Sequence, residues 1–268
     1  MFSIEQRVDN NETGYNFAIS VRSARRAMPQ NPDGLGNQLL DALIGSKRLL
    51  VMRMETISLD LRDVLYEPNR PIRNVYFPVS GIVSLVLEVG NGKTVEVATI
   101  GNEGFIGVPV FLGADRTQGT AFSQISGRAL RISVAAFRDL LAMMPGFTKI
   151  LNRYVQALLV QIAQGNACNG SHPVEQRCAR WLLVTQDRVG QSPFVLTQDF
   201  LAQMLGVGRT SVNHVATTLQ NAGLIRYSRG LITILDRKGL EARSCQCYDA
   251  IRAEFRRMLR DIQGQADQ

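Results

Sequence analysis

The stretch LAQMLGVGRTSVNHV, residues 201–215, carries hydrogen-bonding side chains at helical spacing. A helix that begins near Arg209 turns one face outward, and every side chain on that face donates or accepts hydrogen bonds. These side chains are Arg209, Thr210, Asn213, His214 and Thr217. Arginine can bond guanine O6 and N7 together, and asparagine can do the same with adenine. Backbone N–H groups at the starts of two helices, with Thr197 and Ser211, can hold phosphates. The pattern therefore indicates the chemistry of reading double-stranded DNA.

The apolar residues of this region predict how those side chains are positioned. Thr197 can cap a helix over about 198–205, and Asp199 in its first turn suits the positive end of the helix dipole. Gly206 allows a turn with positive φ, after which a second helix starts near Arg209. The inward positions are Leu201, Ala202, Leu205, Val207, Val212, Val215 and Leu219. Two helices packed in this way form a helix-turn-helix, whose second helix enters the major groove.

The charge of the region also favours an anionic partner. No Asp or Glu lies between Asp199 and Asp236, and the charged side chains of that interval are Arg209, Arg226 and Arg229. Residues 224–235 alternate in polarity and turn at Ser228-Arg229-Gly230, which predicts a two-stranded wing with Arg229 near the sugar-phosphate backbone. A plain helix hairpin in a protein core is the alternative, but it explains neither the missing acids nor the polar outer face.

The rest of the chain shows two spacings of apolar residues, one typical of strands and one typical of helices. From about residue 57 to 132, apolar residues come in short runs separated by Gly, Pro, Asn and Asp, and VSLVLEV-GNGK-TVEVATI predicts two strands joined by a tight turn. Several short strands at this spacing predict a β-barrel, a sandwich or a jelly roll. Amphipathic helices are expected over 38–45, 135–144, 147–168, 174–189 and 247–262.

The helix expected over 147–168 carries an apolar stripe with residues three and four apart. The stripe contains Leu151, Val155, Leu158, Leu159 and Ile162. Such a stripe needs a partner: it either pairs two copies of the chain, which we favour, or packs against its own domain. The cluster NGSHP, residues 169–173, is expected to break the helix and act as a hinge.

These features together resemble the Crp/Fnr family of bacterial transcription regulators. TQDFLAQMLGVGRTSVNHVATTLQNAGLI with its wing is similar to the family's C-terminal domain, and IRNVYFPVSGIVSLVLEVGNGKTVEVATIGNEGFIG is similar to its cyclic-nucleotide-binding-type β-roll. The resemblance implies an α+β fold. Its expected parts are a β-roll (jelly roll) sensor domain over 37–146, a dimerisation helix over 147–169 and a winged helix-turn-helix DNA-binding domain over 170–268. Residues 1–36 are expected to form a polar, disordered lead.

The resemblance also implies roles for single residues. Arg209 falls on the family's guanine-reading arginine, Thr210 where many members carry a cytosine-reading glutamate, and His214 where many carry a second arginine. The mode of binding is therefore expected to follow the family, but not its usual half-site. The implied partners are DNA with a near-palindromic operator, a second copy of the chain, and RNA polymerase. The expected dimer interface contains Leu151, Val155, Leu158 and Ile162.

The ligand pocket departs from the family pattern. Cyclic-nucleotide binders of this family carry Gly-Glu before a short helix and then Arg-Ser or Arg-Thr; the glutamate holds the ribose hydroxyl and the arginine neutralises the phosphate. This chain has Gly107-Val108 as the first pair and Gln118-Gly119 at the spacing of the second, with Arg116-Thr117 nearby. Val108 cannot accept a hydrogen bond from a ribose hydroxyl. We expect a degenerate pocket with an unknown or lost ligand, formed by Gly107, Val108, Arg116, Thr117 and Gln118.

The sequence predicts neither catalysis nor a cofactor. It shows no paired carboxylates with matched partners, no nucleophile elbow and no phosphate-cradling loop. Cys168 and Cys178 fall on expected helices, where a core role is favoured. Cys245-Gln246-Cys247 offers two thiols, too few alone for a tetrahedral zinc site, and the two histidines, His172 and His214, give little support for a haem or metal sensor.

The composition of the chain limits the class of protein to which it can belong. The net charge of +7 weakly favours an anionic partner, and four cysteines in 268 residues do not form a disulfide framework. No apolar run approaches the roughly 18 residues that cross a bilayer. We expect a cytoplasmic regulator that is not an enzyme and holds no metal. The competing interpretation is a module for a small ligand or cyclic nucleotide whose C-terminal helices make protein contacts.

Overall fold

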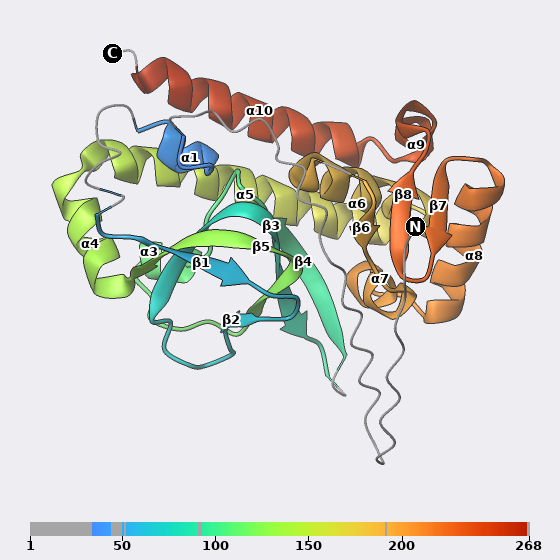
Figure 1. Cartoon of the computed structure of the whole chain (residues 1–268), viewed down its shortest axis with the longest axis horizontal. Helices are drawn as coiled ribbons and strands as arrows, with labels where there is room; N and C mark the ends of the chain where they lie inside the picture. Colours follow the sequence, from blue (N-terminus) through green and yellow to red (C-terminus); the bar gives the residue numbers. More distant parts are fainter. Residues whose placement is uncertain (1–33, 44–49, 51, 91–92, 191, 267–268) are drawn as a thin grey trace, which may run out of the picture.

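The computed structural model describes residues 34–43, 50, 52–90, 93–190 and 192–266, with side chains up to residue 263. An antiparallel sheet forms the N-terminal half, and helices dominate the C-terminal half (Figure 1). The expected lead over 1–36 lies outside the described residues except for 34–36. The first predicted helix is α1 (Gln38–Asp41), which the side chain of Asn37 caps, and the predicted positions 44 and 45 are not described.

The N-terminal sheet is the predicted β-roll. Its strands are β1 (Glu55–Leu59), β2 (Val64–Tyr66), β3 (Asn74–Glu88), β4 (Thr94–Ile100) and β5 (Thr120–Ser133). They pair antiparallel in the order β1-β5-β3-β4, and β2 also pairs with β5. The register of β3 against β5 shifts between Pro78 and Val83, which bends both long strands and curls the sheet. The predicted hairpin of residues 83–100 is confirmed as β3 and β4.

Aromatic rings attach this sheet to the helices beside it. Phe77 of β3 stacks on Phe105 with ring centroids 5.6 Å apart, and Phe105 lies 5.1 Å from Tyr154. Phe137 of α4 (Val134–Met143) packs edge-on against Phe147 at 5.9 Å. Each such pair contributes about 0.5–1.5 kcal/mol beyond the burial of its surface. Because Phe147 and Tyr154 belong to the long helix α5 (Pro145–Ser171), the first half of α5 is fixed to the roll.

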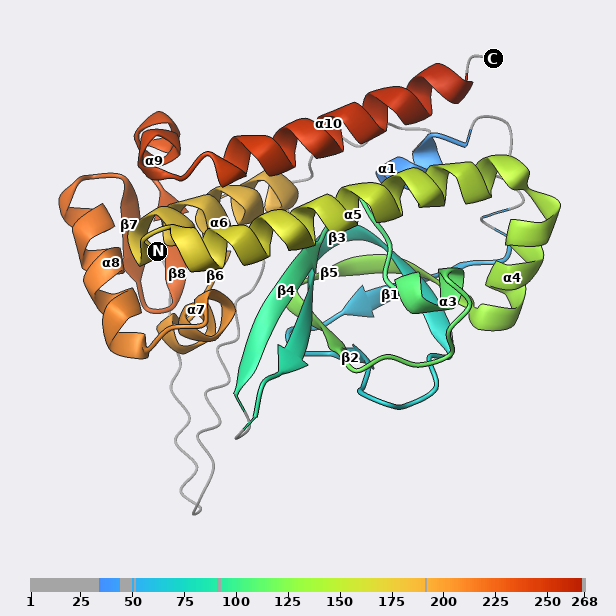
Figure 2. The ribbon, with the colours of Figure 1, turned by 180° about the vertical axis from the view of Figure 1, so that it is seen from behind.

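The long helix α5 (Pro145–Ser171) lies between the roll and the C-terminal helix α10 (Cys247–Ala266) (Figure 2). Four residues of its stripe are covered within one chain: Leu151, Val155 and Leu158 are buried in the core, and Ile162 is partly buried against it. The four residues expected in the dimer interface therefore pack within their own chain, against the roll and α10. Leu159 of the same stripe is 56% exposed.

The predicted hinge is shorter than the NGSHP cluster. Helix α5 continues through Ser171 and ends at His172, whose backbone is extended (φ −113°, ψ 144°). Pro173 then precedes α6 (Val174–Val189), where a missing N–H costs the helix nothing. The break is thus limited to His172 and Pro173.

The C-terminal half contains three further helices and a small sheet. The helices are α7 (Gln198–Leu205), α8 (Arg209–Asn221) and α9 (Arg237–Arg243), and the strands are β6 (Phe194–Val195), β7 (Ile225–Ser228) and β8 (Leu231–Ile234). The strands pair in the order β6-β8-β7, so the predicted wing has a third strand. Neither β6 nor α9 was predicted, because both are too short to show a period. Within the described part of the chain, no helix is long and apolar enough to cross a membrane.

Arg188, near the end of α6, joins the two halves. Its Nε donates a hydrogen bond to Oε1 of Glu103 at 2.7 Å, and another nitrogen donates to Oε1 of Gln161 on α5 at 2.8 Å. It also bonds Thr99 of β4, and its guanidinium lies 5.9 Å from the ring of Phe255 on α10. The Arg188 and Glu103 side chains are only 7% and 11% exposed. This buried ion pair therefore connects the roll, α5, α6 and α10.

Glu96 of β4 makes a second contact between the halves. The indole N–H of Trp181 on α6 donates to Oε1 of Glu96 at 2.9 Å, and the Ser84 hydroxyl donates to Oε2 at 2.9 Å. Glu96 also lines a cavity of about 450 Å³ between β4, α5 and α6. Burial raises the pKa of Glu96 to about 7, although these hydrogen bonds and the charges of Arg180 and Arg188 act to lower it.

Arg188→Ala should lower the free energy of unfolding by about 3–5 kcal/mol, because Glu103 would stay buried without its charge partner. Denaturant titration of the full chain measures this loss. The double variant Arg188→Ala with Glu103→Gln should recover part of it, since the uncompensated charge is then absent. A double variant no more stable than Arg188→Ala would contradict the role assigned to the pair.

Glu96 should make the chain less stable as the pH rises. Its pKa is about 7 when folded and near the ordinary value of 4.5 when unfolded, so between these values the folded chain keeps a proton that the unfolded chain has lost. The resulting stabilisation is complete below about pH 4.5 and disappears by about pH 7, a fall of up to about 3 kcal/mol. Urea titrations at about pH 5 and pH 8 measure it. Glu96→Gln should show a smaller fall, and an equal fall would refute this assignment.

Candidate nucleic-acid interface

The helix-turn-helix begins and ends where local residues predict. The Thr197 hydroxyl accepts the N–H of Phe200 at 3.2 Å and caps α7. Gly206 ends α7 with φ 64°, the left-handed conformation that glycine adopts without strain. Val207 closes the turn, and α8 starts at Arg209. The expected cap, turn and start of the second helix are all confirmed.

The apolar faces of α7 and α8 pack together and onto α6. The predicted inward residues Leu201, Ala202, Leu205, Val212, Val215 and Leu219 are buried, and Val207 is partly buried. Trp181 and Leu182 of α6 belong to the same core. Because this packing fixes the rotation of α8 about its axis, the opposite face of α8 is directed to solvent.

That opposite face carries the predicted readers. Its exposed side chains are Arg209, Thr210, Ser211, Asn213, His214 and Thr217. Thr197, at the start of α7, is exposed as well. Gly208 precedes α8, and no described side chain caps this helix. Its first N–H groups are therefore suited to an anion such as a phosphate.

Three of these side chains have partners within the domain. The carboxylate of Asp199 lies 3.4 Å from Nε of Arg209, and both side chains are well exposed. Gln198 donates a hydrogen bond to Oδ1 of Asn213 at 3.2 Å, and the Thr217 hydroxyl donates to the Asn213 carbonyl at 2.9 Å. Exposed ion pairs contribute little stability, so Arg209 can exchange Asp199 for a base at small cost. Sequence reasoning missed Asp199 and Gln198 as partners of the two readers.

Arg229 lies at the tip of the wing. The two-residue turn Arg229-Gly230 joins β7 to β8, and both residues have positive φ, 50° and 76°. This is the geometry of tight hairpin turns. Arg226 and Arg229 are exposed, and Gln220 of α8 accepts the N–H of Tyr227 at 2.9 Å. That bond holds the wing against the second helix, and burial raises the pKa of Tyr227 there.

The five residues expected in a degenerate ligand pocket differ in burial and in their contacts. Gly107 is buried with φ 122° at the start of α3 (Val108–Phe111), where a side chain would press on Val75. Arg116 is exposed, and its guanidinium makes two 3.1 Å hydrogen bonds to the neighbouring Asp115. Thr117 is half-buried and Gln118 is exposed. The cavities found beside α5 and α6 are lined by none of the five residues.

The cysteines are free and buried. Cys178 belongs to the core of the C-terminal half, and Cys168 is also buried, as expected. Cys168, however, packs against Cys245 and Cys247, and His172 lies beside them. The sequence showed only the C-x-C pair; the signal that was passed over is Cys168 and His172, four residues apart and hence on one face of a helix. These four side chains are the described residues that could hold a metal.

Two family models match the chain. A cyclic nucleotide-binding domain matches residues 56–143, and a Crp-like helix-turn-helix domain matches residues 176–243. No curated protein matches the sequence.

Solved structures of regulators share the fold. FixK2 from Bradyrhizobium japonicum aligns with a TM-score of 0.60 at 15% identity, over 72% of this chain and 98% of that chain. TTHB099, a transcriptional regulator of the CRP family from Thermus thermophilus, aligns with a TM-score of 0.60 at 17% identity, over 70% and 96%. The c-di-GMP-responsive global regulator CLP of Xanthomonas campestris aligns with a TM-score of 0.58 at 18% identity, over 70% and 96%.

At these sequence identities the structural similarity establishes the fold, and the two domain matches establish membership of the family. Both domains stand in the predicted order, joined by the predicted long helix, and together they span more than half of the chain. The chain therefore belongs to the Crp/Fnr family of bacterial transcription regulators.

Proposed function

We propose that the chain is a sequence-specific DNA-binding regulator that acts as a homodimer on a near-palindromic operator. The observation that carries this proposal is the exposed polar face of α8, which is free of acidic side chains and is held outward by an apolar core. Its side chains match the hydrogen-bonding edges of base pairs in the major groove. Arg229 on the wing, with Thr197, Ser211 and Thr217, is suited to phosphate contacts, which set the register of the protein on the duplex.

Arg209 and Asn213 are the proposed direct readers. They lie four residues apart and so share one face of α8. Arg209 at the N-terminal end would bond guanine, and Asn213 would bond adenine one turn further on. Thr210 and His214 are neutral or weakly basic where many family members carry Glu and Arg. We therefore propose an operator that differs from the usual family half-site.

A second copy of the chain is part of the proposal, because one recognition helix covers only half of a palindromic site. The proposed seam is the exposed side of α5, which carries Gln156, Leu159 and Ala163. Leu159 is 56% exposed in the middle of a long helix, and the small Ala163 one turn on permits close approach. Binding to such a site requires the two α8 helices of a dimer to lie about 34 Å apart, one turn of DNA. RNA polymerase is the proposed partner of the bound dimer.

The β-roll is proposed to work without a cyclic nucleotide bound in the family's manner. Val108 stands where an acceptor for the ribose hydroxyl is required, and a valine side chain cannot accept a hydrogen bond. The roll would then serve as the support against which the DNA-binding half is held.

Arg209→Ala should weaken binding to the operator by about 1–3 kcal/mol, because a bidentate contact to guanine is lost. The operator is first obtained by selecting bound duplexes from a random pool with the wild-type chain, and affinities are then measured by fluorescence anisotropy. The loss should be confined to duplexes that carry the guanine which Arg209 reads. Arg128→Ala removes the same charge from an exposed site on β5 and should bind like the wild type. Unchanged affinity of Arg209→Ala for every duplex would show that α8 does not read bases.

Leu159→Glu should raise the dimer dissociation constant by about tenfold or more, because the seam would bury an unpaired carboxylate. Sedimentation equilibrium measures the constant. Leu112→Glu is the matched control, since Leu112 is 65% exposed and belongs to the roll, at the end of α3, rather than to α5. A Leu159→Glu chain that dimerises as tightly as this control would place the interface elsewhere.

A further inference from the structure

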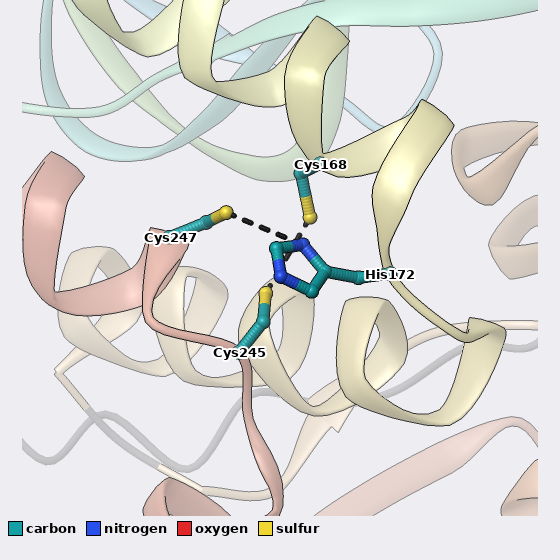
Figure 3. Close-up of side chains that lie close together, drawn as sticks. All are labelled: Cys168, His172, Cys245 and Cys247. Carbon is teal, nitrogen blue, oxygen red and sulfur yellow. Dashed lines mark hydrogen bonds between the residues drawn. The ribbon is translucent and has the colours of Figure 1, made fainter.

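Three cysteines and one histidine meet where α5 ends and α10 begins. Cys168 and His172 come from the end of α5, and Cys245 and Cys247 come from the segment that follows α9 (Figure 3). Their ligand atoms all lie within 4.8 Å of one another. The cysteines are buried and His172 is half-buried. The DNA-reading surface described above uses none of these side chains.

The distances fit a single metal ion. Sγ of Cys168 lies 3.4 Å from Sγ of Cys245, and Sγ of Cys247 lies 3.5 Å from Nδ1 of His172. A tetrahedron with Zn–S near 2.3 Å and Zn–N near 2.0–2.1 Å has edges of about 3.5–3.8 Å. A disulfide would bring the sulfurs to about 2.0 Å, and a multi-iron cluster would hold them further apart. The side chains are therefore spaced for one small cation.

We propose that Cys168, His172, Cys245 and Cys247 form a mononuclear metal site of the Cys₃His type that binds Zn²⁺. Thiolate and imidazole are the ligands that this borderline-soft cation prefers. Four protein ligands close the tetrahedron, which is typical of a structural site rather than a catalytic one. Each cysteine binds as a thiolate, so its proton passes to solvent as the ion enters.

Neighbouring side chains suit the bound state. The amide of Gln164 on α5 donates to Sγ of Cys247 at 3.0 Å, the kind of outer hydrogen bond that orients a ligand. Three thiolates and a neutral imidazole around Zn²⁺ leave one net negative charge. The buried guanidinium of Arg177 on α6 interacts electrostatically with Cys168 and Cys245, and its Nε has no hydrogen-bond partner among the described residues. A compensating cation is thus already in place.

The position of the site gives it a consequence for the fold. Two ligands precede α6 and two follow α9, so the metal would tie together both ends of residues 173–244, the segment that contains the helix-turn-helix and wing. Closing this long loop removes conformational freedom from the unfolded chain. Arg177 also bonds the carbonyl of Leu205, the last residue of α7, which links the site to the turn before the reading helix.

Metal content and coordination test the proposal directly. The full-length chain is produced with added zinc, and loosely bound metal is then removed. Plasma mass spectrometry should find about one Zn²⁺ per chain. Replacement by Co²⁺ should give the thiolate-to-cobalt charge-transfer absorption and the intense visible bands of tetrahedral cobalt. A chain that holds no stoichiometric zinc and gives no thiolate–cobalt absorption overturns the proposal.

Variants assign the ligands. Cys168→Ser and Cys247→Ser should lower zinc affinity by more than about a hundredfold, and Gln164→Ala by about ten- to a hundredfold, in competition with a chromophoric chelator. Cys178→Ser is the matched control, because Cys178 is equally buried but lies in another core. Equal losses in Cys178→Ser and Cys168→Ser would overturn the assignment. His172→Ala, at the half-exposed end of α5, disturbs the core least and should also change the cobalt spectrum.

A thermal readout and a DNA readout separate this proposal from the proposed function. Removing zinc should lower the melting temperature of the wild type but not that of Cys168→Ser. It should also weaken binding to the selected operator, and only this last expectation rests on the proposed function. Zinc binding without DNA binding would refute the function and leave the site intact. Strong operator binding by a chain that takes up no metal would refute the site alone.

Discussion

The buried pair of Arg188 and Glu103 sets a constraint that reaches every part of the molecule. Arg188 belongs to α6 and Glu103 to the segment after β4, while Gln161 and Phe255, which also contact Arg188, belong to α5 and α10. A charge in such surroundings is tolerable only while its partner stays in place. The C-terminal half therefore cannot turn away from the roll without leaving one of the two charges buried and unpaired. This contact therefore opposes a rotation of the C-terminal half about the short break at His172.

The direction of helix α8 depends on the position of α6 and on the packing of α8 itself. Val212, Val215 and Leu219 are buried against α7 and α6, and they fix the rotation of α8 about its axis. A shift of one residue in this packing would rotate the helix by about 100° and turn Arg209 away from its present direction. Folding uses one face of this helix and the proposed base contacts use the opposite face, so the apolar face determines where the polar face points.

Local signals predicted the helix-turn-helix closely, because its boundaries depend on residues adjacent in sequence. The cap at Thr197 and the left-handed Gly206 need nothing from the rest of the chain. The burial of Leu151, Val155 and Leu158 within one chain was missed for the opposite reason. Periodicity shows which face is apolar but not what covers it, and α10 comes much later in the chain. Arg188 and Glu103 are 85 residues apart in the sequence, and Cys168 and Cys245 are 77 apart. A local sequence pattern could therefore predict neither pairing.

Two of the places that hold the C-terminal half differ in how they can be released. Arg188 fixes α6 against the roll, and the cysteine–histidine cluster stands at the entrance and exit of the DNA-binding segment. A change in the direction of α8 requires one of these contacts to give way. The ion pair can break only by exposing a buried charge, whereas metal ligation by thiolates is reversible by chelation and by protonation. On the proposed assignments, the roll lacks the acceptor that the ribose hydroxyl of a cyclic nucleotide requires, because Val108 stands in its place. The reversible element then lies at the end of α5 rather than inside the β-roll.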